Sequence, residues 1–300
     1  MENARFNQFE YLFVEGLSDE LEESLTHEYN LVVLDIEDIF TNTQLSKIEQ
    51  RSDYLYTAFQ FPEYDKNLGK FNIKEVHCVV SKDLLIVIDK NNHKHAIQFN
   101  NLKLNLFDQS ITSYDLFFEM LDFFVTKDFR AISRFKSEIT ELEHDIFTFE
   151  IQNDLVQDIL VLKRNLATFY GVITPLTEVV GDLQTKYSKN LSTEDLEKLD
   201  DTLDKLKKMK NNVQTMIQHA ELLSESNNAL IARSTNEVIR VLTAISIIAI
   251  VPTMMFSFFG MNVYFGWGES GTYLPLLGVI LLSLSLTATV WWYFKRRGWL

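Results

Sequence analysis

Cysteine is almost absent from this chain of 300 residues, because Cys78 is the only one. A disulfide within the chain is therefore excluded, as are zinc and iron–sulfur sites built from four cysteines. Basic residues are also scarce, since 28 Lys and Arg stand against 42 Asp and Glu, which gives a formal net charge of −14. Phosphate binding needs clustered Lys and Arg, so this balance argues against a nucleic-acid partner and suits cations instead.

Catalytic motifs are missing as well. We find no nucleophile elbow, no P-loop and no Cys-His arrangement, so we do not expect an enzyme. The stretch from Gly266 to Gly271 fits G-x-G-x-x-G, but no strand precedes it and no βαβ unit surrounds it. His93 and His95 have no third ligand nearby, which favours a polar strand or turn over a metal pair.

Charge is nearly missing from the last part of the chain. Residues 241–300 contain only Glu269, Lys295, Arg296 and Arg297 as charged groups, a sum of +2 that leaves −16 on residues 1–240. The uncharged run from Val241 to Phe259 would extend about 28 Å as a helix, which matches a bilayer core of roughly 30 Å.

A second uncharged run covers Tyr273 to Phe294, with Pro275 near its start, where a helix tolerates proline. The sequence thus predicts two membrane spans, with membrane lipid as a partner.

Basic residues flank the spans on one side only. Arg240 stands just before the first span, and Lys295, Arg296 and Arg297 follow the second. By the positive-inside rule both ends face the cytoplasm, and the linker is a short external loop. Residues Met1 to Glu10 show no signal-peptide pattern, so we expect a cytoplasmic N-terminal part and a multi-pass protein of the cytoplasmic membrane. A two-helix hairpin cannot enclose a pore by itself, so an ion path would require several subunits.

The N-terminal part has the pattern of a mixed α/β domain. Strands are predicted at Tyr54–Phe61, Glu75–Val80 and Leu84–Asp89, with a turn at Ser81–Asp83 and a helix at Asp19–Glu28. From Ser113 onward the periodicity is helical, and the only breakers before the membrane are Gly171, Pro175 and Gly181.

A long helix should connect the soluble part to the first span. Residues 182–251 contain no Gly or Pro, and Thr193 followed by Glu194 and Asp195 is typical of a helix start. Apolar residues then follow the three-four spacing of a packing seam, beginning Leu196, Leu199, Leu203 and Leu206, and continuing through Val213, Ile217 and Ala220. A rigid spacer and a mechanical lever are both compatible with this pattern.

The sequence at the end of the first span is Phe258-Phe259-Gly260-Met261-Asn262-Val263. An aromatic residue, then Gly-Met-Asn, then an apolar residue, between two C-terminal spans, resembles the signature of the CorA family of magnesium and cobalt transporters. The resemblance implies a funnel-shaped homopentamer: an α+β cytoplasmic domain, a long stalk helix and two C-terminal transmembrane helices, of which the first lines the pore.

On this basis we divide the chain into six segments. They are a cytoplasmic α/β domain (1–112), a cytoplasmic acidic helical pair (113–190), a stalk helix continuing into the first transmembrane helix (191–259), an external loop (260–272), a second transmembrane helix (273–294) and a basic cytoplasmic tail (295–300).

Polar residues of the first span support a pore. They recur at separations of seven, three, seven and four residues, near one stripe of a helix: Asn236, Thr243, Ser246, Thr253 and Ser257. Five copies of this stripe would place polar groups and water along the axis of a pentamer, while Leu242 and Ile250 would form apolar constrictions. The alternative is that each hydroxyl bonds only to its own helix backbone.

The entrance would be built from Gly260, Met261 and Asn262. Mg²⁺ loses water reluctantly and prefers oxygen ligands, so five Asn262 oxygens and the Gly260 carbonyls would hold the hydrated ion. Met261 has a soft thioether and is expected to pack rather than bind. Family members often carry a Pro-Glu pair and several acidic residues in the external loop, whereas only Glu269 is charged here. Attraction of cations to the mouth should therefore be weaker.

Regulation by cytoplasmic Mg²⁺ is the last expectation. The long helix opens with six carboxylates, which would repel one another between neighbouring subunits and which Mg²⁺ would bridge in a closed state. The resemblance implies a stalk aspartate paired with one on the adjacent α/β domain. Counting back from the Gly-Met-Asn motif points to Asp201, with Asp200 beside it, and we take Asp89 as the candidate partner. The predicted function is a Mg²⁺ channel, also admitting Co²⁺ or Ni²⁺. The alternatives are a zinc transporter of the related branch and a membrane-anchored coiled-coil scaffold or sensor without a pore.

Overall fold

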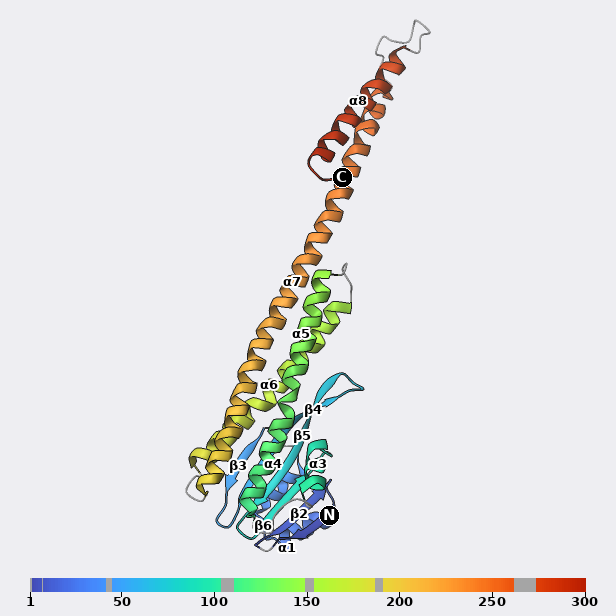
Figure 1. Cartoon of the computed structure of the whole chain (residues 1–300). Helices are drawn as coiled ribbons and strands as arrows, with labels where there is room; N and C mark the ends of the chain where they lie inside the picture. Colours follow the sequence, from blue (N-terminus) through green and yellow to red (C-terminus); the bar gives the residue numbers. More distant parts are fainter. Residues whose placement is uncertain are drawn as a thin grey trace. The chain divides into compact units, whose positions relative to one another are not determined.

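The computed structural model describes residues 2–6, 8–41, 45–103, 111–148, 154–186, 191–261 and 274–300. They form two compact units, Met1–Ser224 and Glu225–Leu300, here called the N-terminal and C-terminal units (Figure 1). Helix α7 (Thr193–Phe259) contributes its first half to one unit and its second half to the other. The six functional segments of the sequence remain a prediction, whereas the α/β class of the soluble part and the two C-terminal helices are confirmed.

The N-terminal unit is built on a six-stranded sheet. Its strands are β1 (Glu2–Arg5), β2 (Glu10–Glu15), β3 (Lys47–Gln50), β4 (Leu55–Asp65), β5 (Lys70–Val80) and β6 (Leu84–Asp89). They lie in the order β1-β2-β6-β5-β4-β3, and β2 pairs with β6 in parallel while all other neighbours are antiparallel. The predicted turn at Ser81–Asp83 joins β5 to β6, and the Ser81 N–H donates to the Leu84 carbonyl over 2.8 Å.

Helices cover both faces of the sheet, because its central strands carry apolar side chains on both sides. On β6, Ile86 and Ile88 belong to the core beneath α1 (Asp19–His27) and α2 (Val33–Phe40), whereas Leu85 and Val87 belong to the opposite core. That second core is shared with α3 (Lys94–Lys103), α4 (Ser113–Asp128), α5 (Arg130–Thr148), α6 (Asp154–Lys186) and the first half of α7. The result is a layer of two short helices, a sheet, and a layer of longer helices (Figure 1).

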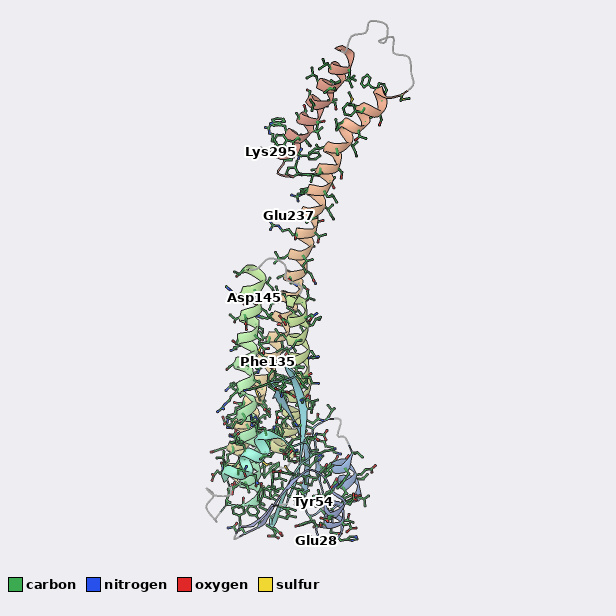
Figure 2. The ribbon with its side chains drawn as sticks, turned by 90° about the vertical axis from the view of Figure 1, so that its right-hand side faces the viewer. Glu28, Tyr54, Phe135, Asp145, Glu237 and Lys295 are labelled. Carbon is green, nitrogen blue, oxygen red and sulfur yellow. The ribbon has the colours of Figure 1, made fainter. Side chains whose placement is uncertain are left out.

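The hairpin of β4 and β5 extends beyond the sheet and contacts the long helices. Phe71 on β5 forms a three-ring cluster with Phe135 on α5 and Phe169 on α6, with centroid distances of 5.3 to 5.5 Å. The Arg134 guanidinium lies 3.2 Å from the ring centroid of Tyr64 on β4. Asn165 of α6 is buried and donates to the Gly69 carbonyl at the hairpin turn over 2.9 Å. These contacts join sheet and helices into one core; Figure 2 labels Phe135 within it.

Three residues predicted to break the helical region do not do so. Gly171, Pro175 and Gly181 all lie inside α6, which is one helix of 33 residues. Proline inside a helix costs about 3 kcal/mol. Here the neighbouring turns carry buried apolar side chains, among them Ile173, Leu176 and Val180. Tertiary packing of this kind overrides local propensity, so the prediction of breaks was wrong.

The interpretation of His93 and His95 as a polar strand or turn also needs correction. His93 follows the turn at Lys90–Asn91, but its side chain is fully buried between the rings of Phe61 and Phe124, with centroids at 5.4 and 5.2 Å. Burial lowers the pKa of His93 to about 3, so the imidazole is neutral. His95 lies in the first turn of α3.

Candidate ion pathway

Helix α7 begins where the sequence predicts it. Ser192 and Asp195 form a capping box: the Asp195 N–H donates to Ser192 Oγ over 3.1 Å, and the Ser192 N–H donates to Asp195 Oδ2 over 3.0 Å. The predicted seam is buried at Leu199, Leu203 and Leu206, and it continues as Met209, Val213, Met216, Ala220 and Leu223. The helix then runs through 67 residues to Phe259, which confirms the continuous helix into the first predicted span.

Among the residues that the structure describes, two helices are long and apolar enough to cross a membrane, judged by length and composition. One is α7, whose most apolar window has a mean hydropathy of 2.1, and the other is α8 (Leu274–Arg296), with 1.7. Only 6% of either window is buried within the chain, which distinguishes both from core helices of a soluble protein. In Figures 1 and 2, α8 lies beside the second half of α7.

The second half of α7 has two contrasting faces. On one face the side chains are buried or half-buried: Ala244 is fully buried, and Ile248, Val251, Pro252, Met255 and Phe259 are partly covered. These residues recur every three or four positions, as do Ser283, Thr287, Val290 and Phe294, the covered residues of α8. Small side chains at Ala244 and Ser283 allow membrane helices to approach closely. We take these rows as the contact between the two helices.

The predicted polar stripe lies on the opposite face of α7. At 100° per residue, Ser246 and Ser257 point about 140° to 160° away from Ala244, and Thr243 points about 100° away from it. All the stripe residues are exposed in the single chain, from Asn236 to Ser257, with Thr253 among them. Leu242 and Ile250, the predicted constrictions, are 63% and 58% exposed. The stripe is therefore available to other subunits or to water, and α8 does not cover it.

The hydroxyls of the stripe bond to their own helix. Thr243 donates to the Ile239 carbonyl over 2.7 Å, and Ser246 donates to the Leu242 carbonyl over 2.8 Å. Thr253 does the same to Ala249 over 2.9 Å. This was the alternative considered for the sequence pattern, but it is compatible with an ion path. A hydroxyl that donates its hydrogen inward keeps its oxygen lone pairs as acceptors, and oxygen acceptors suit water around a hard cation.

The end of α7 requires glycine at position 260. The Gly260 N–H donates to the Phe256 carbonyl over 2.9 Å, which closes the last turn. A Cβ at this position would lie 2.9 Å from the same carbonyl oxygen, closer than real side chains approach, so the backbone would have to shift. Met261 is 57% exposed. Asn262 and Glu269 lie outside the described residues, as does the rest of the predicted external loop.

The stalk carboxylates already have partners within the chain. Asp201 forms an ion pair of 2.6 Å with Lys205, which also contacts Asp122 of α4 at 2.7 Å. Asp200 accepts a hydrogen bond of 2.9 Å from Gln184 Nε2 on α6. Both aspartates remain exposed. They are therefore accessible to solvent cations, which would compete with these exposed contacts.

Asp89, the predicted partner of the stalk aspartates, lies in a buried environment. Its side chain is fully buried, and both carboxylate oxygens accept the His93 N–H, at 2.8 and 2.7 Å. Burial raises the pKa of Asp89 to about 6, although these backbone hydrogen bonds oppose the shift. A buried carboxylate occupied by backbone donors fixes the turn into α3. Its carboxylate is therefore poorly placed to meet another subunit.

Acidic residues gather in one cavity of the N-terminal unit, of about 320 Å³. Glu138, Glu141 and Asp145 of α5 line it together with Asp158 and Asn165 of α6. These are carboxylates of the region predicted as the acidic pair. Among the residues that the structure describes, however, no three His, Cys, Asp or Glu side chains converge as ligands of one metal ion.

Sequence reasoning missed a carboxyl pair at the start of the stalk. Asp195 lies close enough to Asp115, the capping-box residue in the first turn of α4, for the two carboxyl groups to interact electrostatically, and Asp195 Oδ1 is buried without a hydrogen-bond partner among the described residues. Burial raises the pKa of Asp195, and the neighbouring Asp115 carboxylate adds to the shift, so Asp195 holds a proton more tightly than an exposed aspartate. In the sequence, each of these two residues looks like an ordinary helix-capping residue. Only the fold brings the two helix starts together.

A family model named "CorA-like Mg2+ transporter protein" matches residues 6–296. The chain is 25% identical over 277 residues to the cobalt/magnesium transport protein CorA of Thermotoga maritima, covering 88% of this chain and 76% of that protein.

Solved structures show the same fold. The complete CorA magnesium transporter of Methanocaldococcus jannaschii superposes with a TM-score of 0.86 at 18% identity, covering 100% of this chain and 95% of that one. The full-length CmaX protein superposes with a TM-score of 0.78 at 12% identity, covering 98% of this chain and 90% of that one. At these low sequence identities, the similarity to the solved structures shows a shared fold only.

Proposed function

The chain belongs to the family of CorA-like Mg²⁺ transporters, and on that premise we propose that five copies form a channel whose pore is lined by the polar face of α7. Membership makes the protein a membrane transporter of divalent metal ions and not an enzyme, and it removes the scaffold without a pore from consideration. The transported ion is Mg²⁺, and Co²⁺ and Ni²⁺ are further substrates in this proposal. Both termini face the cytoplasm, as the basic residues beside the spans indicate.

The proposal is supported mainly by the two different faces of helix α7, one covered and apolar and the other exposed and polar. The covered row through Ala244 and Met255 fits α8, while the row through Thr243 and Ser246 stays exposed. Hydroxyls that faced lipid would find no hydrogen-bonding partner among the acyl chains, whereas around a pore axis they would contact water and hydrated ions. In the pentamer, α7 forms the inner ring and α8 the outer one.

At the external end of this path, Gly260 and Asn262 form the entrance. The Gly260 N–H closes the last turn of α7, and Asn262 follows two residues later in the sequence. Amide and carbonyl oxygens from five subunits would hold a hydrated Mg²⁺ through its waters, without carboxylates that would retain it. Glu269 adds one negative charge per subunit near the mouth.

Assembly is the first test. The detergent-solubilised protein should have a protein mass of about 175 kDa by light scattering, five times the chain mass of 35.0 kDa. A hairpin of two spans cannot surround an ion, so the path exists only between subunits. A protein mass matching one or two chains in a preparation that still transports Mg²⁺ would contradict the proposal.

Regulation involves the exposed stalk carboxylates Asp200 and Asp201. In a five-fold bundle they lie near the neighbouring subunit, and cytoplasmic Mg²⁺ between subunits would offset their repulsion. The ion stabilises the closed state only if it binds that state more tightly than the open one. Loss of Mg²⁺ would then let the subunits separate and release the constriction at Leu242.

Replacing Asp200 and Asp201 with Asn should weaken inhibition of transport by internal Mg²⁺, and it should reduce the protection of α7 against protease that Mg²⁺ provides. The matched control is Asp182→Asn on α6, because Asp182 pairs with Lys186 at 2.7 Å much as Asp201 pairs with Lys205 at 2.6 Å. This control should respond to Mg²⁺ like the parent protein. If the double variant also matches the parent in both assays, the sensor lies elsewhere.

A further inference from the structure

The end of α8 carries three cations that form no ion pair within the described part of the chain. Between Leu274 and Leu300 the sequence contains Lys295, Arg296 and Arg297 but no Asp or Glu. All three are exposed, and they follow directly on an apolar helix long enough to span a membrane (Lys295 is labelled in Figure 2).

Each cation lies over an aromatic ring one turn earlier in the helix. Lys295 Nζ is 4.8 Å from the ring centroid of Trp291, and Arg296 Cζ is 5.3 Å from that of Trp292. Arg297 Cζ is 5.5 Å from the ring of Tyr293. Three consecutive pairs, each rotated by about 100° from the last, surround most of the helix circumference. The three aromatic residues are 46% to 56% exposed, so the cations contact rings on the surface of the helix and not rings of a protein core.

The backbone holds this arrangement in place. Gly298 adopts a left-handed conformation with φ +69°, its N–H donates to the Lys295 carbonyl, and the Trp299 N–H donates to the Phe294 carbonyl over 3.0 Å. These two bonds form a Schellman motif, and the ring of Trp299 packs on Phe294 at 5.3 Å, as the motif favours. The helix thus ends immediately after its cations, and the carbonyl groups of Phe294 and Lys295 are satisfied.

We propose that this surface, Trp291 to Arg297, binds the headgroups of anionic phospholipids. Trp and Tyr rings prefer the level of the headgroups, where one end of the ring is apolar and the other wet. Cations held on those rings then meet the lipid phosphates, and guanidinium groups bind phosphate in a bidentate manner. A dissolved phosphate would match the charges but would leave the exposed rings unused, so the lipid is the occupant that fits both features. The inference rests on α8 spanning the membrane and does not depend on ion conduction.

Fluorescence quenching by brominated lipids tests this directly. Three of the four tryptophans, Trp291, Trp292 and Trp299, lie at this end of α8, and Trp267→Phe removes the fourth. In reconstituted full-length protein, brominated phosphatidylglycerol should quench more strongly than brominated phosphatidylcholine at equal mole fraction. Each cation removed should reduce the preference about fivefold. The triple variant K295Q/R296Q/R297Q should lose it.

The matched control removes three cations from the N-terminal unit, as K207Q/K208Q/K210Q, and should keep the full preference. Single variants at Lys295, Arg296 and Arg297, with melting temperatures equal to the parent, provide the result if the triple variant does not fold. Equal quenching by both lipids in the parent, retention of the preference in the triple variant, or its loss on adding soluble glycerol phosphate would overturn the proposal. A protein that transports Mg²⁺ but shows no lipid preference would contradict only this inference. A protein that prefers anionic lipid but does not transport Mg²⁺ would contradict only the proposed function.

Discussion

Mg²⁺ uptake into liposomes containing the Asn262→Ala variant is expected to fall to the leak of protein-free liposomes. Mg²⁺ gives up its waters reluctantly, so an entrance must offer oxygen atoms that accept hydrogen bonds from the hydrated ion. Alanine removes five such oxygens from the ring. Gly260→Ala should have the same effect for a different reason, because its Cβ would lie 2.9 Å from the Phe256 carbonyl oxygen and force the backbone to shift two residues before Asn262.

The control at the entrance is Met261→Leu, which keeps an apolar side chain of similar volume between the two critical positions. It should transport Mg²⁺ at nearly the parental rate, because the thioether of Met261 has no role as a ligand in this account. All variants should assemble with the parental mass. Parental flux through Asn262→Ala would show that the signature is not the filter.

Ser246→Phe is expected to reduce Mg²⁺ flux on the order of tenfold or more, because five phenyl rings would project into the pore and exclude water from it. Ser246 is exposed and lies on the face of α7 opposite Ala244. The same substitution at Ser285, which is exposed on α8, provides the matched control. Ser285→Phe adds an apolar ring to a helix that faces lipid in this arrangement, so its flux should stay within about twofold of the parent.

Equal loss of flux in the two phenylalanine variants, with assembly intact, would show that the polar row of α7 does not line the path. A loss only at Ser285 would assign the inner ring to α8. The experiment therefore decides which helix surrounds the axis, and isotope uptake into liposomes, normalised to the amount of reconstituted protein, measures it.

The membrane helices were predictable because their signal is compositional. A run without charge, a helix start at Thr193 and basic residues after the second run depend on neighbouring residues alone. The polar stripe was predictable in the same way, from spacing. The sequence did not show which face of α7 would be covered, because the covering residues, such as Ser283, lie on another helix.

The sheet was harder to predict where its residues leave the typical pattern. Strand β4 was expected to end at Phe61, but it continues through Pro62 to Asp65, and β5 begins five residues before the expected Glu75. Proline is unusual inside a strand, and the continuation depends on contacts with α5 and α6 that are far away in sequence. The edge strands β1 and β3 are too short to give a periodic signal.

The burial of the carboxylates was likewise hard to predict from the sequence. Asp89 and Asp201 look alike in the sequence, yet one is buried beneath backbone donors and the other is exposed beside Lys205. Counting residues from a motif places a side chain along a helix, but it gives no information about burial. The structure therefore supports Asp200 and Asp201 as candidates and argues against Asp89.

The central claim is that this chain by itself conducts Mg²⁺. The most direct measurement is ion influx into liposomes that contain only the purified protein, with Mg²⁺, Co²⁺ and Zn²⁺ compared at equal concentration and driving force. The account predicts Mg²⁺ influx that exceeds Zn²⁺ influx and that high internal Mg²⁺ suppresses. Zn²⁺ influx without Mg²⁺ influx, or no influx above that of protein-free liposomes, would contradict it.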